Sequence, residues 1–222
     1  MTTPVSLKID FVSDVVCPWC AVGLYSLEQA AARLKGEVAL DMHFQPFELN
    51  PHMAPEGQDM EAHLHEKYGS TPEQQAQMRA VITERGAQVG FTFRMDKRSR
   101  TWNTFDAHRL LHWLGEEGAA GQQSALKHAL FKAYFTDGES PSSHTVLLRI
   151  AQELGLDVGR AQAILASDAY AVDVRSAEQR WQALGIHSVP AVVINERHLI
   201  SGGQPVEVFE QALRQIAQQP AQ

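Results

Sequence analysis

Two cysteines three positions apart, Cys17 and Cys20, constrain the fold of this 222-residue chain more than any other feature. They come shortly after residues 5–11 (VSLKIDF), where apolar and polar side chains alternate strictly, which predicts a strand. Behind them, apolar residues recur at helical spacing from Leu24 to Leu34, which predicts a helix ending near Gly36. Cys17 is therefore expected to follow the first strand and to open the first helix.

The close spacing of the two cysteines argues against a stabilising role. A structural disulfide stabilises mainly by closing a long loop in the unfolded chain, and a bridge between Cys17 and Cys20 would close almost none. The unpaired N–H groups and the positive dipole end at a helix start favour a thiolate. We therefore expect Cys17 to be an exposed nucleophile with a lowered pKa, and Cys20, one turn deeper, to resolve a mixed disulfide.

The neighbours of the pair each have a chemical or a structural interpretation. Pro18 suits the first helical position, where its missing N–H would have had no partner. Trp19 offers an apolar platform beside the sulfur atoms, or a packed cover on the first turn. For Asp14, three residues before Cys17, an N-terminal helix cap is favoured over a proton relay.

A Cys-x-x-Cys pair is also half of a zinc site. A closed zinc site needs four ligands, and the chain has no second cysteine pair. Two histidine pairs, His63 with His65 and His108 with His112, have spacings that bind metals, but no third ligand accompanies either pair. We therefore predict no metal site.

The two ends of the chain predict a small α/β domain, and the middle predicts helices. Residues 38–44 alternate as a second strand, so the first quarter forms a βαβ unit. Residues 191–195 and 198–200 predict an antiparallel pair before a helix that begins near Pro205. Further helices are expected after the capping box of residues 71–74 and over residues 105–114, 122–135, 145–154, 158–166 and 169–184, with Gly115, Gly155 and Gly185 as stops. We therefore divide the chain into a discontinuous domain, residues 1–49 and 186–222, and a helical insertion, residues 50–185.

Pro190 stands at the entrance of the strand expected over residues 191–195. Proline is excluded from central strands, so a proline here marks either an edge or a cis bond in a tight turn. Only about one X-Pro bond in twenty is cis in folded proteins, so position alone does not predict a cis bond.

Four motifs together resemble a known superfamily. They are residues 10–20 (DFVSDVVCPWC), Asn103 and Thr104 with residues 107–110 (AHRL), residues 185–190 (GIHSVP) and residues 201–205 (SGGQP). The chain resembles the thioredoxin superfamily, more narrowly its DsbA-like branch, and most narrowly the FrnE-like thiol oxidoreductases. The resemblance covers essentially the whole chain and implies an α/β, thioredoxin-like fold with a large all-helical insertion.

The same resemblance implies roles for residues far from the cysteines. Pro190 matches the cis-proline that faces the cysteines, and Val189 matches the residue whose backbone pairs with substrate. Asn103 and Thr104, which by themselves indicate a helix cap, would lie over the active-site cleft. Gly202, Gly203 and Gln204 would line that cleft. The dipeptide Pro18-Trp19 is neither the Gly-Pro of thioredoxin nor the Pro-His of DsbA, so no redox potential is carried over.

The function implied is a cytoplasmic thiol:disulfide oxidoreductase that reduces, oxidises or isomerises disulfides of a protein or a small-molecule thiol substrate. We expect no bound cofactor, with glutathione as a candidate co-substrate. With 19 Lys and Arg against 26 Asp and Glu, a net charge of -7 argues against nucleic acid and anionic membranes as partners. No N-terminal signal pattern or apolar membrane-spanning stretch is visible.

Three other interpretations stay open. The first is a glutathione-dependent isomerase or transferase, because the FrnE-like group is similar to 2-hydroxychromene-2-carboxylate isomerases and kappa-class glutathione transferases. Those enzymes have serine at the active site in place of the cysteine pair, which favours redox chemistry here. The others are a small-molecule redox enzyme of a biosynthetic pathway and a module without catalysis. The physiological substrate, electron donor, net direction and oligomeric state are not determined by the sequence.

Overall fold

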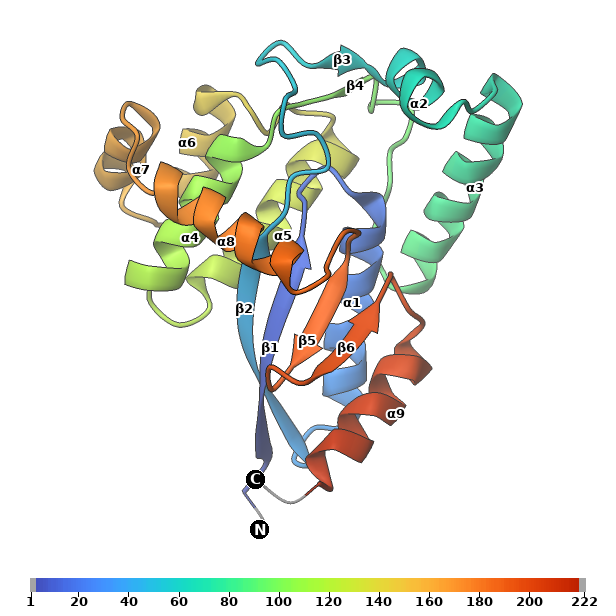
Figure 1. Cartoon of the computed structure of the whole chain (residues 1–222), viewed down its shortest axis with the longest axis vertical. Helices are drawn as coiled ribbons and strands as arrows, with labels where there is room; N and C mark the ends of the chain where they lie inside the picture. Colours follow the sequence, from blue (N-terminus) through green and yellow to red (C-terminus); the bar gives the residue numbers. More distant parts are fainter. Residues whose placement is uncertain (1–2, 220–222) are drawn as a thin grey trace.

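The centre of the molecule is a mixed sheet with the strand order β2-β1-β5-β6 (Figure 1). The structure, a computed structural model, describes residues 3–219, so the outermost residues of the predicted discontinuous domain, 1–2 and 220–222, lie outside the described part. The strands are β1 (Val5–Ser13), β2 (Val38–Pro46), β5 (Ala191–Ile194) and β6 (His198–Ser201). β1 is parallel to β2 and antiparallel to β5, and β5 is antiparallel to β6. The pairings predicted at both ends of the chain are confirmed.

Strand β1 lies inside the sheet and leads to the cysteines. Leu7, Ile9 and Phe11 are buried, as the alternation predicts. Asp10, expected on a polar face, is buried as well and accepts a hydrogen bond from Gln45 Nε2 at 2.7 Å. Asp10 is buried because other elements cover both faces of β1 at this end. The alternation of side chains within one segment does not reveal such coverage.

Helices α1 (Pro18–Arg33) and α9 (Val206–Ala217) pack against each other beside the sheet (Figure 1). The buried residues of α9 recur at helical spacing: Val206, Phe209, Leu213 and Ile216. Helices α4 (Phe105–Glu117), α5 (Gln122–Lys132) and α8 (Ala171–Ala183) contact the edge strand β2. The cysteine-bearing helix is thus held between the sheet, the C-terminal helix and the middle of the chain.

The middle of the chain contains more than the predicted helices. Helices α3, α4, α5, α6, α7 and α8 confirm predicted segments, but α2 and a two-stranded ribbon of β3 and β4 were not predicted. The elements not yet bounded are β3 (Gln58–Asp59), α2 (Met60–Tyr68), α3 (Pro72–Gln88), β4 (Arg100–Thr101), the π-helical turn η1 (Ala133–Asp137), α6 (His144–Glu153) and α7 (Val158–Leu165). Gly115 does not end a helix, because α4 continues to Glu117. Gly155 and Gly185 each follow the end of a helix and have a positive φ, as expected of glycines that stop a helix.

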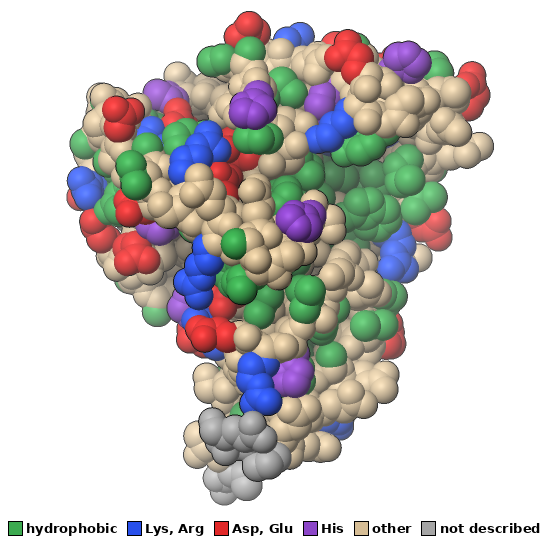
Figure 2. All heavy atoms as spheres, viewed as in Figure 1, with side chains coloured by type: hydrophobic (Ala, Val, Ile, Leu, Met, Phe, Trp, Pro, Cys, Tyr) green, Lys and Arg blue, Asp and Glu red, His purple; other side chains and the backbone are tan. Residues whose placement is uncertain are grey.

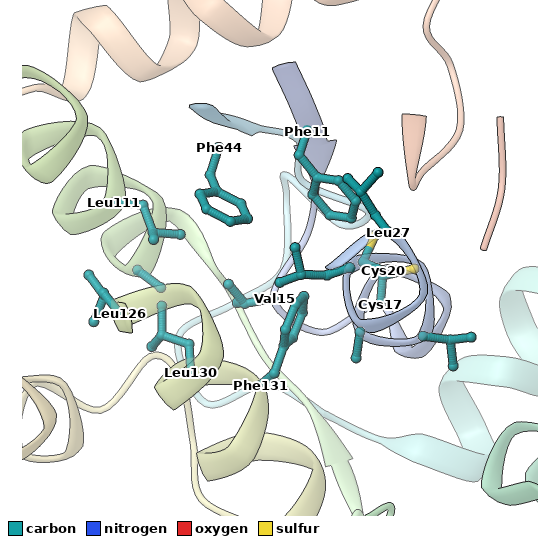
Figure 3. Packing of buried hydrophobic residues seen from close by; sticks show 14 of the residues in the cluster. Phe11, Val15, Cys17, Cys20, Leu27, Phe44, Leu111, Leu126, Leu130 and Phe131 are labelled. Carbon is teal, nitrogen blue, oxygen red and sulfur yellow. The ribbon is translucent and has the colours of Figure 1, made fainter. Parts of the chain in front are cut away.

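A buried cluster joins the two ends of the chain to its middle. Figure 3 shows Phe11 and Phe44 from the sheet beside Leu111, Leu126 and Phe131 from α4 and α5, all members of one apolar cluster. The division into a discontinuous domain and an insertion stays a prediction. Within residues 3–219, no helix combines the length and apolar character needed to span a membrane.

Candidate active site

Cys17 lies at the predicted junction between β1 and α1. It occupies the N-cap of α1, with Pro18 in the first turn, and the Cys20 N–H donates to the Cys17 carbonyl at 3.1 Å. The prediction that its sulfur is exposed is wrong, because only 4% of Cys17 and 0% of Cys20 is accessible. The Val189 backbone lies over the thiol, which donates a hydrogen bond to the Val189 carbonyl oxygen at 3.7 Å.

The two thiols have opposite electrostatic environments. Hydrogen bonding to the Cys20 thiol lowers the pKa of Cys17, and the N–H groups of Cys20 and Trp19 act in the same direction against burial and the charge of Asp14. Burial raises the pKa of Cys20 well above its ordinary value, and the neighbouring Cys17 raises it further. The geometry therefore favours Cys17 as the thiolate and keeps Cys20 protonated.

Segments near the C-terminus complete the surroundings of the pair. The Val189–Pro190 peptide bond is cis, as the resemblance implies, and the Gly202 N–H donates to the Pro190 carbonyl at 2.8 Å. A Cβ atom on Gly203 would lie 2.8 Å from the Trp19 carbonyl oxygen, so a side chain has no room there. The structure thus brings Val189, Pro190, Gly202 and Gly203 to the start of α1.

The contacts of Trp19 and Gln204 are structural, and they do not test a chemical role for either side chain. Trp19 is half-buried and packs against the core cluster, which agrees with a cover on the first turn of α1. The Gln204 side chain donates to the Ser201 carbonyl at 2.8 Å and so supports the loop before α9. A platform role for Trp19 and a substrate role for Gln204 stay predictions.

The favoured prediction for Asp14, an N-terminal helix cap, is wrong. Cys17 occupies the N-cap of α1, and no side chain makes a cap hydrogen bond there. Asp14 Oδ2 accepts from the Leu49 N–H at 2.7 Å, and Oδ1 accepts from the Val16 N–H at 3.4 Å. Burial by itself raises the pKa of Asp14, but His108, the Leu49 N–H and Lys127 together bring it below its ordinary value. A charged carboxylate therefore lies beneath the cysteine pair.

Two buried side chains near Asp14 were not assigned to the site from the sequence. His108 is 2% exposed, and its Nε2 lies 3.4 Å from Asp14 Oδ1. Lys127 is 0% exposed, and within residues 3–219 its Nζ has no hydrogen-bond partner. Figure 3 shows Phe131, one turn after Lys127, directed toward Val15, and the Lys127 Nζ lies 4.9 Å from the Phe131 ring centroid. The sequence feature that could have identified Lys127 is the position of a lysine on the apolar face of a helix.

Asn103 and Thr104 begin α4. Asn103 Oδ1 accepts from the Phe105 N–H at 2.9 Å, and its Nδ2 donates to the Met53 carbonyl at 2.9 Å. Thr104 is the buried N-cap residue and makes no side-chain cap bond. The capping role expected of this pair is thus performed by Asn103, and a position over the substrate cleft stays a prediction.

The histidine pairs make ordinary polar contacts where contacts are present. His63 Nδ1 lies 2.8 Å from Gln58 Oε1, and His65 Nδ1 lies 3.3 Å from the Ser70 carbonyl. Among the residues that the structure describes, no group of three or more His, Cys, Asp or Glu side chains is arranged to hold a metal ion.

A cavity of about 890 Å³ lies between α2, α3 and residues 95–99. Figure 2 shows hydrophobic side chains gathered in a hollow on this part of the surface, and Met60, Leu64 and Met95 contribute apolar lining to the cavity. Arg98 lines it too, and its guanidinium donates to the carbonyl of Val16, the residue before Cys17, at 3.4 Å. Arg98 thus links the lining of the cavity to the cysteine motif, although neither cysteine lines the cavity.

The family assignment follows from a match over nearly the whole chain. A family model described as the DSBA-like thioredoxin domain matches residues 8–214, which include both cysteines and the cis-proline. The chain belongs to this family. The predicted α/β, thioredoxin-like fold is confirmed, and a FrnE-like subgroup is consistent with it.

Solved structures support the assignment. A probable DsbA oxidoreductase of Streptomyces coelicolor is 33% identical, with a TM-score of 0.87 over 97% of this chain and 92% of that one. A 2-hydroxychromene-2-carboxylate isomerase is 14% identical, with a TM-score of 0.72 over 94% and 95% of the two chains. The cytosolic disulfide reductase DsbM of Pseudomonas aeruginosa, in a structure with GSH, is 17% identical, with a TM-score of 0.62 over 94% and 98%. The last two similarities show the fold alone.

Proposed function

We propose that this DsbA-like protein is a thiol:disulfide oxidoreductase that uses Cys17 and Cys20 as its redox couple. The observation that carries the proposal is the opposite electrostatic bias of the two thiols: the pKa of Cys17 is lowered by hydrogen bonding to Cys20, and the pKa of Cys20 is raised by burial. Cys17 is thereby favoured as the attacking thiolate, and Cys20 stays protonated until the second step.

The proposed reaction runs in two exchange steps. The Cys17 thiolate attacks a substrate disulfide, forming a mixed disulfide and releasing one substrate thiolate, which takes up a proton. Cys20 then loses its proton and attacks the Cys17 sulfur, so that the Cys17–Cys20 bond forms and the second substrate thiolate leaves. Two electrons pass from the cysteine pair to the substrate, and the reverse sequence oxidises a dithiol.

Substrate would enter across Val189. In the resting dithiol, the Val189 carbonyl accepts from the Cys17 thiol, and the cis bond to Pro190 presents this backbone beside the sulfur. An extended substrate segment could pair with that backbone as an added strand. The cavity of about 890 Å³ between α2, α3 and residues 95–99, which Arg98 links to the Val16 carbonyl, would take apolar parts of a polypeptide or small-molecule disulfide. We propose that the protein acts as a reductant or isomerase in the cytoplasm, without a bound cofactor.

Cys20→Ser is expected to trap the first intermediate. The variant retains the attacking sulfur but lacks the resolving one, so it should accumulate a covalent adduct with a disulfide substrate. Intact-mass spectrometry after mixing with glutathione disulfide should show one glutathionyl group on Cys17, released by a reductant. Absence of any adduct under conditions in which wild-type protein turns over would contradict the proposal.

The alternative of a glutathione-dependent isomerase or transferase rests on the shared fold of the isomerase neighbour and on the cavity between α2, α3 and residues 95–99. If glutathione is a co-substrate, calorimetric titration of the Cys17→Ser/Cys20→Ser double variant with reduced glutathione should show saturable binding. Because this variant cannot exchange disulfides, heat can only report non-covalent binding. Saturable heat would favour glutathione as a co-substrate, and no heat would restrict glutathione to the exchange reaction.

A further inference from the structure

Gly23 lies in the interior of the cysteine-bearing helix α1, one turn after Trp19 and Cys20, and it is buried. A glycine in a helix interior is less favourable than an alanine, because glycine loses more backbone freedom on folding. Gly23 has helical backbone geometry and not the positive φ that would require glycine. Neither helix propensity nor backbone conformation therefore explains a glycine at this position.

The neighbours of Gly23 explain why no side chain is present. A Cβ atom on Gly23 would lie 3.1 Å from Pro190 Cγ and 3.3 Å from the Gly203 Cα. Both separations are shorter than the roughly 3.5–4.0 Å at which carbon atoms pack best. From the opposite side, a Cβ atom on Gly203 would lie 2.8 Å from the Trp19 carbonyl oxygen and 3.5 Å from the Gly23 nitrogen. Helix α1, the Pro190 ring and the turn before α9 therefore meet at a point where neither glycine has room for a side chain.

This meeting point is connected to the backbone that covers the Cys17 sulfur. Pro190 follows Val189, whose carbonyl oxygen accepts from the Cys17 thiol at 3.7 Å. The Gly202 N–H donates to the Pro190 carbonyl at 2.8 Å, which links this backbone to the turn before α9. Helix α1 carries Cys17 at its N-cap and contacts Pro190 at Gly23. The distance from the Val189 backbone to the Cys17 sulfur therefore depends on how closely Pro190 approaches Gly23.

We propose that Gly23 is a positioning residue that sets the place of the Val189 backbone over Cys17. The inference rests on the proposed function and adds to it the residue that determines how a substrate backbone is placed. Gly23 acts through Pro190 and touches no substrate itself. A methyl group at this position would displace the Pro190 ring by a few tenths of an ångström. The Val189 carbonyl would move with the ring, so a polypeptide paired with Val189 would present its disulfide to Cys17 in a less favourable geometry.

Two disulfides test this role in Gly23→Ala. One is a peptide dimer joined by a single disulfide, which can pair with the Val189 backbone, and the other is hydroxyethyl disulfide, which has no peptide backbone. Each is mixed with reduced protein in the Cys20→Ser background, and formation of the mixed disulfide on Cys17 is followed by acid quenching and intact-mass spectrometry. The ratio of the peptide rate constant to the hydroxyethyl disulfide rate constant is expected to fall about tenfold, because a misplaced substrate reacts up to about 100-fold more slowly.

Gly159→Ala is the matched control. Gly159 is an exposed residue of α7, and a Cβ atom there would lie 3.4 Å from Asp157 Oδ1, an ordinary contact. The same chemical change in another helix should leave the ratio of the two rate constants as it is. Gly23→Ala is expected to fold, because alanine favours the helix and the displacement is small. If it does not fold, Gly203→Ala intrudes on the same meeting point from the other side and should lower the same ratio.

An unchanged ratio in the folded variant would overturn the positioning role of Gly23 and leave the oxidoreductase intact. This holds whether both rate constants stay the same or both fall by one factor, since an equal fall would indicate a change in the Cys17 thiol and not in the placement of substrate. Failure of the proposed function would differ, because the protein with Gly23 in place would then form no mixed disulfide with either compound.

Discussion

Cys17→Ser should lose disulfide-reducing activity by more than about a thousandfold, the scale of removing an attacking nucleophile. The serine hydroxyl stays protonated at neutral pH, so the interactions that lower the pKa of Cys17 have no thiolate to stabilise. Cys20 cannot replace the lost sulfur, because it is fully buried and burial raises its pKa. The measurement is the rate of insulin reduction, and of glutathione mixed-disulfide reduction, at fixed dithiothreitol concentration.

The control for this variant is its fold. Serine is close in size to cysteine, and circular dichroism and thermal unfolding should match those of the wild-type protein. Activity of a well-folded Cys17→Ser equal to wild type would end the redox proposal. The glutathione-dependent alternative would then remain, and the titration with reduced glutathione tests it.

Asp14→Ala should destabilise the protein by about 3–5 kcal/mol, the usual cost of removing one partner from a buried charged group. The substitution leaves the Leu49 N–H without its acceptor at 2.7 Å and leaves Lys127 without its nearby negative carboxylate. Urea unfolding at pH 7 measures the loss. A change within about 0.5 kcal/mol, the range of surface substitutions, would show that the carboxylate contributes no net stability.

The pH dependence of this loss has a definite sign. The pKa of Asp14 is lowered in the folded protein, so the carboxylate contributes stability above its unfolded pKa of about 3.9, and this contribution disappears as the pH falls through the folded value. The difference between wild type and Asp14→Ala should therefore shrink in acid. Adding Lys127→Met to Asp14→Ala should recover part of the loss, with a coupling of about 0.5–3 kcal/mol between the two sites.

The sequence predicted the parts of the site that depend on local order along the chain. Alternation over β1 and helical spacing after Cys20 placed Cys17 at the start of α1, and the family resemblance placed Pro190 opposite it. The burial of Cys17 was missed because Val189, more than 170 positions away, covers its sulfur. The favoured role of Asp14 was wrong for a similar reason, since its partners lie on the segment after β2 and on α4.

The middle of the chain illustrates the same limit. Amphipathic spacing predicted most of its helices, but α2 and the short ribbon of β3 and β4 lack a long apolar period of their own. Lys127 was overlooked because its place on a core-facing stripe has meaning only when α5 is docked against α1. Spacing along one helix reveals which face is buried and leaves open what that face contacts.

The position of the Val189 carbonyl over Cys17 has a consequence for which oxidants the protein tolerates. Hydrogen peroxide and similar small oxidants convert accessible thiolates to sulfenic and sulfinic acids. Only 4% of the Cys17 surface is accessible, so such oxidants should react slowly with its sulfur. In the proposed function, a substrate that pairs with the Val189 backbone would replace this contact as it binds. Cys17 would then be accessible to its substrate and shielded from small oxidants at other times.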